Sequence, residues 1–191
     1  MNVIQEFLNN PVKEKVFAFD FDDVIAIPDE SQQGDLHKTF VKVLGFRKAR
    51  KVGFRRSCHI LKVNPDDIIK NFIKLSPLNP RIFPVFRAIK NNPNTKIVIA
   101  TNNTPEIVIP YLKHYNLSKY IDEVYAPENF NFTWKPKEEY FERMVGELNV
   151  PKENVVFIDD QQANIVSSKN YGITSYLYPK GGNFSFIHQE L

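Results

Sequence analysis

Cysteine is nearly absent from this sequence of 191 residues, with Cys58 as the single example. One cysteine can form no disulfide within the chain and leaves no cysteine-based metal cluster, so we expect Cys58 to be a small, partly buried side chain. The sequence also lacks a run of about 18 apolar residues, which a membrane-spanning helix needs. Residues 1–15 lack the basic and apolar regions of a secretory signal. We therefore expect a cytoplasmic protein that has no membrane partner.

Acidic residues are missing from residues 36–65, where nine basic residues stand. These nine belong to a total of 25 basic residues, so the rest of the chain has 16 basic residues against 22 acidic ones. A basic segment within an acidic body predicts an anionic partner. A small phosphorylated substrate is the partner that we expect. A nucleic acid, the acidic face of a protein, and a solvated helical surface without a specific role remain open as alternatives.

Short apolar runs alternate with amphipathic segments along most of the chain, without internal repeats or low-complexity linkers. We expect strands at residues 15–19, 96–100, 123–126, 155–158 and 174–178. We expect helices at residues 81–90, 104–114, 136–148 and 164–170, and a short leading helix at residues 3–8. Strands that are apolar on both faces and alternate with helices predict an α/β fold with a doubly wound parallel sheet.

Residues 27–76 interrupt this alternation and contain no convincing strand. A polar loop at 27–34 precedes a helical pattern, in which we expect one helix to stop at Gly45 and another to start near Asn64 and Pro65. We therefore predict a small helical cap at residues 27–76, inserted into a core made of residues 1–26 and 77–191. No secondary structure is predicted for the tail at residues 181–191.

Polar side chains follow three of the predicted strands. Asp20, Asp22 and Asp23 end the first strand, residues 101–103 (Thr-Asn-Asn) end the second, and residues 159–160 (Asp-Asp) end the fourth. In an open parallel sheet the carboxyl ends of the strands meet at one edge, where ligands bind. Because buried carboxylates are costly unless they are paired or bind a metal, the acids predict a cation, a cage of hydrogen bonds or a catalytic role at this edge.

Four short motifs occur in order: Asp20-Phe21-Asp22 with Val24, Thr101-Asn102, Lys135 before Pro136, and FIDDQQANI at residues 157–165. In these motifs the sequence resembles the haloacid dehalogenase-like (HAD) hydrolase superfamily. The resemblance covers nearly the whole chain apart from the insertion and the tail. It implies a Rossmann-like core with a cap domain, and a hydrolase of phosphate monoesters.

The resemblance also implies a role for each acid. Asp20 is expected to be the nucleophile that forms an aspartyl-phosphate, and Asp22 to be the general acid and then the general base. Mg²⁺ is the expected cofactor, held by Asp20, by the backbone carbonyl of Asp22 and by Asp160. Asp159 is expected to bind the ion directly or to support the residues that do.

The remaining motif residues are expected to bind the phosphoryl group. Thr101 donates its hydroxyl and Asn102 its backbone N–H, while Lys135 neutralises phosphate charge and orients Asp20. For Asn164 two alternatives are open, ordering of the loop after the strand or local capping and packing.

A helical cap between the first two motifs is typical of this superfamily and implies closure over the site. Its arginines are candidates for a clamp on an anionic substrate, with Arg55 and Arg56 as the chosen pair and Arg47 and Arg50 as further candidates. Asp23 departs from the glycine that many relatives have there, and its role is open. Asp22 argues against dehalogenation. A phosphomutase and a non-catalytic protein that binds a partner through its basic cap are the alternatives to a phosphatase.

Overall fold

The computed structural model describes residues 14–28, 34–179 and 181–191. The predicted leading helix at residues 3–8 lies outside the described residues, as does most of the loop that follows Pro28. Five parallel strands form one sheet in the order β3-β2-β1-β4-β5. The strands are β1 (Lys15–Phe19), β2 (Thr95–Ala100), β3 (Glu123–Tyr125), β4 (Val155–Asp159) and β5 (Thr174–Leu177). The α/β prediction with a doubly wound parallel sheet is confirmed.

The central strand β1 shows why the sheet is buried on both sides. Phe17 and Phe19 pack into one apolar cluster, whereas Val16 and Ala18 pack into another on the opposite face. This division follows from the period of two in a strand, which points successive side chains to opposite faces. β1 pairs with β2 on one side and with β4 on the other, so the strand order reverses around it.

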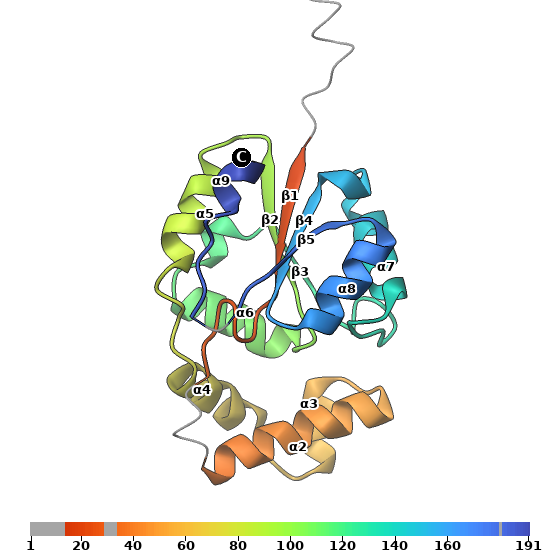
Figure 1. The fold of residues 1–191 in the computed structure, drawn as a ribbon. Helices are drawn as coiled ribbons and strands as arrows, with labels where there is room; N and C mark the ends of the chain where they lie inside the picture. Colours follow the sequence, from red (N-terminus) through yellow and green to blue (C-terminus); the bar gives the residue numbers. More distant parts are fainter. Residues whose placement is uncertain (1–13, 29–33, 180) are drawn as a thin grey trace, which may run out of the picture.

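Helices cover both faces of the sheet, as Figure 1 shows. The helices that follow the cap are α5 (Ile82–Lys90), α6 (Pro105–His114), α7 (Glu138–Leu148), α8 (Gln162–Tyr171) and α9 (Ile187–Glu190). Two short 3-10 helices, η2 (Ser118–Tyr120) and η3 (Lys152–Asn154), complete the connections. Helix α9 lies in the tail for which the sequence predicted no element. Its Glu190 accepts hydrogen bonds from Lys15 of β1 and from Tyr176 of β5, which attach the tail to the sheet.

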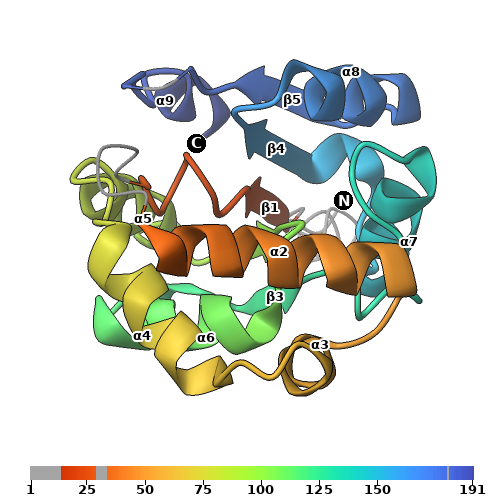
Figure 2. The same cartoon turned by 90° about the horizontal axis from the view of Figure 1, so that it is seen from below.

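Three helices lie beyond the carboxyl edge of the sheet, and we call them the cap helices. They are α2 (Asp35–Arg50), α3 (Phe54–Ile60) and α4 (Pro65–Leu75). Figure 2, seen from the cap side, shows α2 lying across the edge of the sheet with α3 and α4 beside it. The predicted start of α4 is correct, since the side chain of Asn64 accepts a hydrogen bond from the backbone N–H of Asp66 and Pro65 is the first helical residue.

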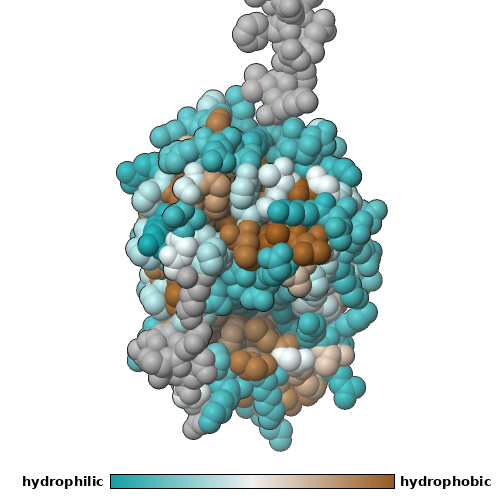
Figure 3. Space-filling model, viewed as in Figure 1, coloured by the Kyte–Doolittle hydropathy of each residue, from teal (hydrophilic) through white to brown (hydrophobic). Residues whose placement is uncertain are grey.

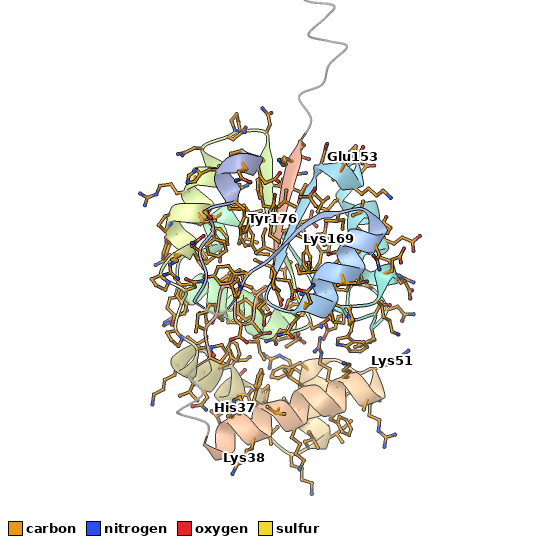
Figure 4. All side chains as sticks on the ribbon, in the orientation of Figure 1. His37, Lys38, Lys51, Glu153, Lys169 and Tyr176 are labelled. Carbon is orange, nitrogen blue, oxygen red and sulfur yellow. The ribbon has the colours of Figure 1, made fainter. Side chains whose placement is uncertain are left out.

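The predicted helix stop at Gly45 is wrong. Helix α2 continues past Gly45 to Arg50 and ends at Lys51, which adopts a left-handed conformation with φ 51°. Gly45 is exposed, while Val43 and Arg47 on the same helix are buried. Burial of one face stabilises the helix by more than the roughly 1 kcal/mol that an internal glycine costs relative to alanine. Figure 4 shows His37 and Lys38 near the start of this helix and Lys51 just past its end.

An aromatic cluster joins the cap helices to the core. Phe72 of α4 stacks on Phe21 with ring centroids 5.8 Å apart and meets Tyr111 of α6 edge-on at 5.9 Å. Phe40 of α2 also packs against Phe72, with ring centroids 5.2 Å apart. Cys58 of α3 is fully buried, more deeply than predicted.

The outer surface differs from this interior. The face in Figure 3 is mainly hydrophilic, with apolar side chains gathered in smaller patches. No helix in the described part of the chain has both the length and the apolar character needed to cross a membrane.

Candidate active site

The carboxyl ends of β1, β2 and β4 bring the predicted motifs to one edge of the sheet. Asp20 follows β1 directly, and its backbone N–H donates to the carbonyl of Ile158 in β4 at 2.8 Å. Thr101 follows β2, and Asp159 is the last residue of β4. Because neighbouring parallel strands end together, residues more than 100 positions apart in the sequence become neighbours here.

Lys135 lies at the centre of this edge and is 2% exposed. Its Nζ is 2.9 Å from Oδ1 of Asp20 and 2.6 Å from Oδ2 of Asp159, and it also donates to the carbonyl of Ala100 at 2.7 Å. Burial alone would lower the pKa of Lys135, but the two carboxylates outweigh burial and raise it. Lys135 is therefore a fixed positive charge.

Asp20 is buried beside this lysine, and its Oδ1 also accepts a hydrogen bond from the backbone N–H of Phe21 at 2.7 Å. Burial raises the pKa of Asp20, and the opposing charge of Lys135 only partly offsets that effect. The charges of Asp159 and Asp22 act in the same direction as burial. This excess of negative charge indicates that the site needs a further cation.

Asp22 is held by a residue that the sequence motifs did not single out. Asn103 donates through Nδ2 to both carboxylate oxygens of Asp22, at 3.1 and 3.2 Å. Burial raises the pKa of Asp22 to about 6, and the hydrogen bond from Asn103 acts in the opposite direction. The only sequence signal for Asn103 was its place directly after the Thr101-Asn102 pair.

Asp159 and Asp160 form a candidate metal centre with Asp20. One carboxylate oxygen of each lies within 4.8 Å of the others. Burial, followed by the charge of Asp159, raises the pKa of Asp160 to about 6. Asn164 donates to both oxygens of Asp159 at 2.9 Å and thereby fixes the orientation of that carboxylate.

Asn102 lies beside Lys135, and Thr101 lies beside Asn103. The side-chain amide of Asn102 donates to the backbone carbonyl of Lys135 at 3.1 Å, and its Oδ1 accepts from the backbone N–H of Lys135 at 2.9 Å. The Thr101 hydroxyl oxygen accepts from the backbone N–H of Asn103 at 2.9 Å. Residues 101–103 are therefore connected to both Lys135 and Asp22.

A comparison with models of protein families tests the resemblance to the HAD superfamily. The model for haloacid dehalogenase-like hydrolases matches residues 66–178, which is more than half of the chain. The chain belongs to this family. The matched span contains Thr101, Lys135 and Asp160, whereas Asp20 and Asp22 precede it. Among curated proteins, no sequence matches this chain.

Solved structures of HAD proteins share the fold at low sequence identity. A variant of a HAD family enzyme from Bacteroides thetaiotaomicron, in complex with magnesium and inorganic phosphate, has a TM-score of 0.72 and 13% identity and covers 91% of this chain and 98% of that chain. A HAD phosphatase from Thermococcus onnurineus has a TM-score of 0.64 and 16% identity, with 90% and 89% covered. An L-2-haloacid dehalogenase has a TM-score of 0.63 and 13% identity, with 87% and 86% covered. The HAD fold therefore serves more than one hydrolytic reaction.

Asp23 stands where many HAD proteins have glycine, and its backbone explains why glycine suits that position. Its φ of 58° lies in the left-handed region, where glycine is unstrained and aspartate is tolerated better than most residues. The backbone N–H of Asp23 donates to the carbonyl of Ala26 at 2.8 Å and closes the turn. The departure from the HAD pattern therefore leaves the loop intact and adds a negative charge beside Asp22.

The two arginines predicted as a clamp lie on the outer surface of the cap. Arg55 forms an ion pair with Asp66 at 3.3 Å, in which about 60% of each side chain is exposed. Arg55 also lines a groove of about 520 Å³ between the cap helices and α6, with Lys70 and Glu106 among its other lining residues. Arg56 is exposed. The cap arginine that reaches the core is Arg47, whose Nη1 donates to the carbonyl of Asn102.

Proposed function

We propose that this HAD hydrolase is a Mg²⁺-dependent phosphatase that cleaves a phosphate monoester through an aspartyl-phosphate on Asp20. The observation that carries the proposal is Asp22, two residues after the nucleophile, held by Asn103 and with its pKa raised to about 6. A carboxyl group with a pKa near the working pH can give up a proton in one step and accept one in the next.

The residues at the candidate metal centre fit Mg²⁺. This ion prefers oxygen ligands, and Asp20, Asp159 and Asp160 offer carboxylate oxygens within 4.8 Å of one another. Asp20, Asp160 and the backbone carbonyl of Asp22 would hold the ion, while Asp159 binds it directly or supports its ligands. The bound ion supplies positive charge that lets an anionic phosphate approach a carboxylate nucleophile.

The reaction has two transfers that balance in protons and bonds. In the first, a carboxylate oxygen of Asp20 bonds to phosphorus, the bond from phosphorus to the ester oxygen breaks, and Asp22 gives its proton to that oxygen. In the second, Asp22 takes a proton from water, the water oxygen bonds to phosphorus, and the bond to Asp20 breaks. Inorganic phosphate leaves, and both aspartates return to their first state.

The neighbouring residues position the phosphoryl group. The Thr101 hydroxyl and the backbone N–H of Asn102 would donate to its oxygens, and Lys135 would offset its charge. Arg55 and Arg56 are proposed to attract the anionic substrate from the cap surface, as solvent-exposed charges rather than as a closed clamp. The substrate is proposed to be a small phosphorylated molecule.

Two features favour phosphatase chemistry over other enzymatic reactions. A dehalogenase releases a halide, which needs no proton, so Asp22 would have no general-acid role in that reaction. A phosphomutase would need an acid–base group on the cap for a sugar hydroxyl, and the basic segment at residues 36–65, which has no Asp or Glu, offers no clear candidate.

The test is hydrolysis of an aryl phosphate with Mg²⁺ and with excess EDTA, by the wild-type protein and by Asp20→Asn. We expect turnover only by the wild type and only with Mg²⁺, and formation of a phosphorylated protein whose mass exceeds that of the free chain by one phosphoryl group. A wild type that is no faster than Asp20→Asn on any phosphate ester would refute the proposal and leave the non-catalytic alternative.

A further inference from the structure

Arg47 is a charged residue in the last turn of α2, yet only 1% of it is exposed. Its Nε and Nη2 donate to the two carboxylate oxygens of Glu128 at 2.6 and 2.7 Å. Nη1 donates to the carbonyl of Asn102 at 3.1 Å, and Nη2 also donates to the carbonyl of Asn103 at 3.0 Å. Glu128, Asn102 and Asn103 all belong to the core, so this side chain of the cap binds the core and does not face solvent.

The two carbonyls belong to the residues that hold the catalytic groups in place. The side chain of Asn102 binds the backbone of Lys135 on both its N–H and its C=O. The side chain of Asn103 donates to both oxygens of Asp22. Arg47 is thus connected to Lys135 through Asn102, and to Asp22 through Asn103.

We propose that Arg47 is a positioning residue, which couples docking of the cap to the placement of Lys135 and Asp22 by fixing the carbonyls of Asn102 and Asn103. The proposal concerns catalysis and therefore rests on the proposed phosphatase function. Arg47 itself touches neither Asp20 nor the candidate metal centre in the contacts described above, and its guanidinium is already bound to four oxygens.

The geometry of the guanidinium suits this task. Its planar fork meets Glu128 with two parallel hydrogen bonds, and two of its three remaining N–H donors then point in fixed directions at the two carbonyls. A lysine in its place would retain the charge but would lose this fixed orientation. When α2 moves away from the core, the four hydrogen bonds break together, so residues 101–103 are fully held only when the cap is docked.

Kinetics with an aryl phosphate test this role in Arg47→Met, in Arg47→Lys and in a control, Lys48→Met, which removes an exposed charge from the next position of the same helix. We expect Arg47→Met to lower kcat by about 10- to 100-fold per folded molecule, with KM within about threefold of the wild type. Arg47→Lys is expected to fall between the wild type and Arg47→Met, and Lys48→Met to match the wild type. If Arg47→Met does not fold, Arg47→Lys decides the question.

Hydrogen exchange gives a readout that does not depend on turnover. The backbone N–H groups of Asn103 and Thr104 donate to side chains within the same loop. We expect their exchange to become at least about tenfold faster in the Arg47 variants and to stay unchanged in Lys48→Met. Unchanged exchange, or an unchanged kcat in a folded Arg47 variant of an active enzyme, would overturn the inference. If the wild type is inactive but amide exchange is faster in the Arg47 variants, the phosphatase proposal is refuted. The proposal that Arg47 positions the loop at residues 101–103 is then still supported.

Discussion

Two buried cations, Lys135 and Arg47, both contact the loop at residues 101–103, and their surroundings differ. Lys135 meets the carboxylates of Asp20 and Asp159 and one carbonyl, in a region that also contains further acids. Arg47 meets one carboxylate, that of Glu128, and two carbonyls. The first group has an excess of negative charge, whereas the second is balanced.

The difference separates a reactive site from a structural contact. A charge-balanced pair, in which Arg47 uses four of its five N–H donors, gains little from a further ion, so it holds the cap in one position. An unbalanced group of carboxylates is costly until a cation arrives, and this cost provides the affinity for a metal and for chemistry that moves charge. Both arrangements contain buried charges. Around Lys135, however, the carboxylates outnumber the cations that the described residues supply.

The largest expected effect concerns the unbalanced group. Lys135→Met removes the cation that lies between Asp20 and Asp159, and we expect kcat to fall by about 10²- to 10³-fold because a fixed charge at the reacting group is lost. Steady-state kinetics with an aryl phosphate at saturating Mg²⁺ measure this change. A loss no greater than that of Arg47→Met would remove the distinction between the two cations.

The balanced pair is expected to affect stability more than chemistry. Glu128→Gln leaves the buried Arg47 without its counter-charge, and we expect the free energy of unfolding to drop by about 2 kcal/mol, below the 3–5 kcal/mol of fully buried pairs because Glu128 is 21% exposed. Urea denaturation measures it. Glu139→Gln, which breaks an exposed pair with Arg143, is the control and is expected to cost less than about 0.5 kcal/mol. Equal losses in the two variants would contradict the comparison.

The excess of negative charge predicts a smaller effect of pH and metal. The pKa values of Asp22 and Asp160 are raised to about 6 from 3.8, so the folded protein binds more protons than the unfolded chain between these values. Stability without metal should therefore fall as the pH rises from about 4 to 6.

Substitution of one of these acids isolates the effect. In EDTA at pH 7.5, Asp160→Asn should raise Tm by about 2–4 °C, as expected for a gain of about 1 kcal/mol in a chain of this size. Mg²⁺ should raise the Tm of the wild type and leave that of Asp160→Asn nearly unchanged. Thermal unfolding followed by circular dichroism tests both statements, and a wild type that is indifferent to Mg²⁺ would contradict them.

The smallest expected effect belongs to the exposed arginines. The double variant Arg55→Glu and Arg56→Glu should raise KM for a small phosphate ester by about threefold at low salt and have no effect at about 0.5 M salt, because exposed charges are screened. Lys74→Glu, a charge reversal on α4, serves as the control. An unchanged KM at low salt would leave the two arginines without a role in binding substrate.

Much of the fold and of the site was predictable because short-range signals agreed. Three of the five strands, β1, β2 and β4, are apolar runs that end in polar residues, so their parallel pairing and the gathering of Asp20, Thr101 and Asp159 at one edge followed from local sequence. Lys135 was expected there from the resemblance to the HAD superfamily. The structure confirms the α/β class. It adds helix α9, since a four-residue helix held by Lys15 and Tyr176 leaves no periodic pattern in the sequence.

The contacts between distant segments could not be predicted. In the sequence Arg47, Arg55 and Arg56 are alike, as basic residues in one helical segment. Which of them is buried depends on the direction in which α2 crosses the sheet edge and on the acid that it meets 81 positions later, Glu128. The same reason explains the error at Gly45, where burial of the opposite helix face outweighed a local preference.

Arg47 lies beside Trp134, so its contact with the core can be followed by fluorescence. Trp134 is the only tryptophan of the chain, it is 7% exposed, and the guanidinium of Arg47 lies 5.9 Å from the centre of its ring. A cation over an indole ring interacts with its π electrons, so we expect the emission of the ring to shift when that cation is removed or displaced. When tryptophan is excited selectively over the eight tyrosines, the intrinsic fluorescence of the protein thus comes from one indole beside Arg47 of α2. Its emission maximum reports the position of the cap without any added label.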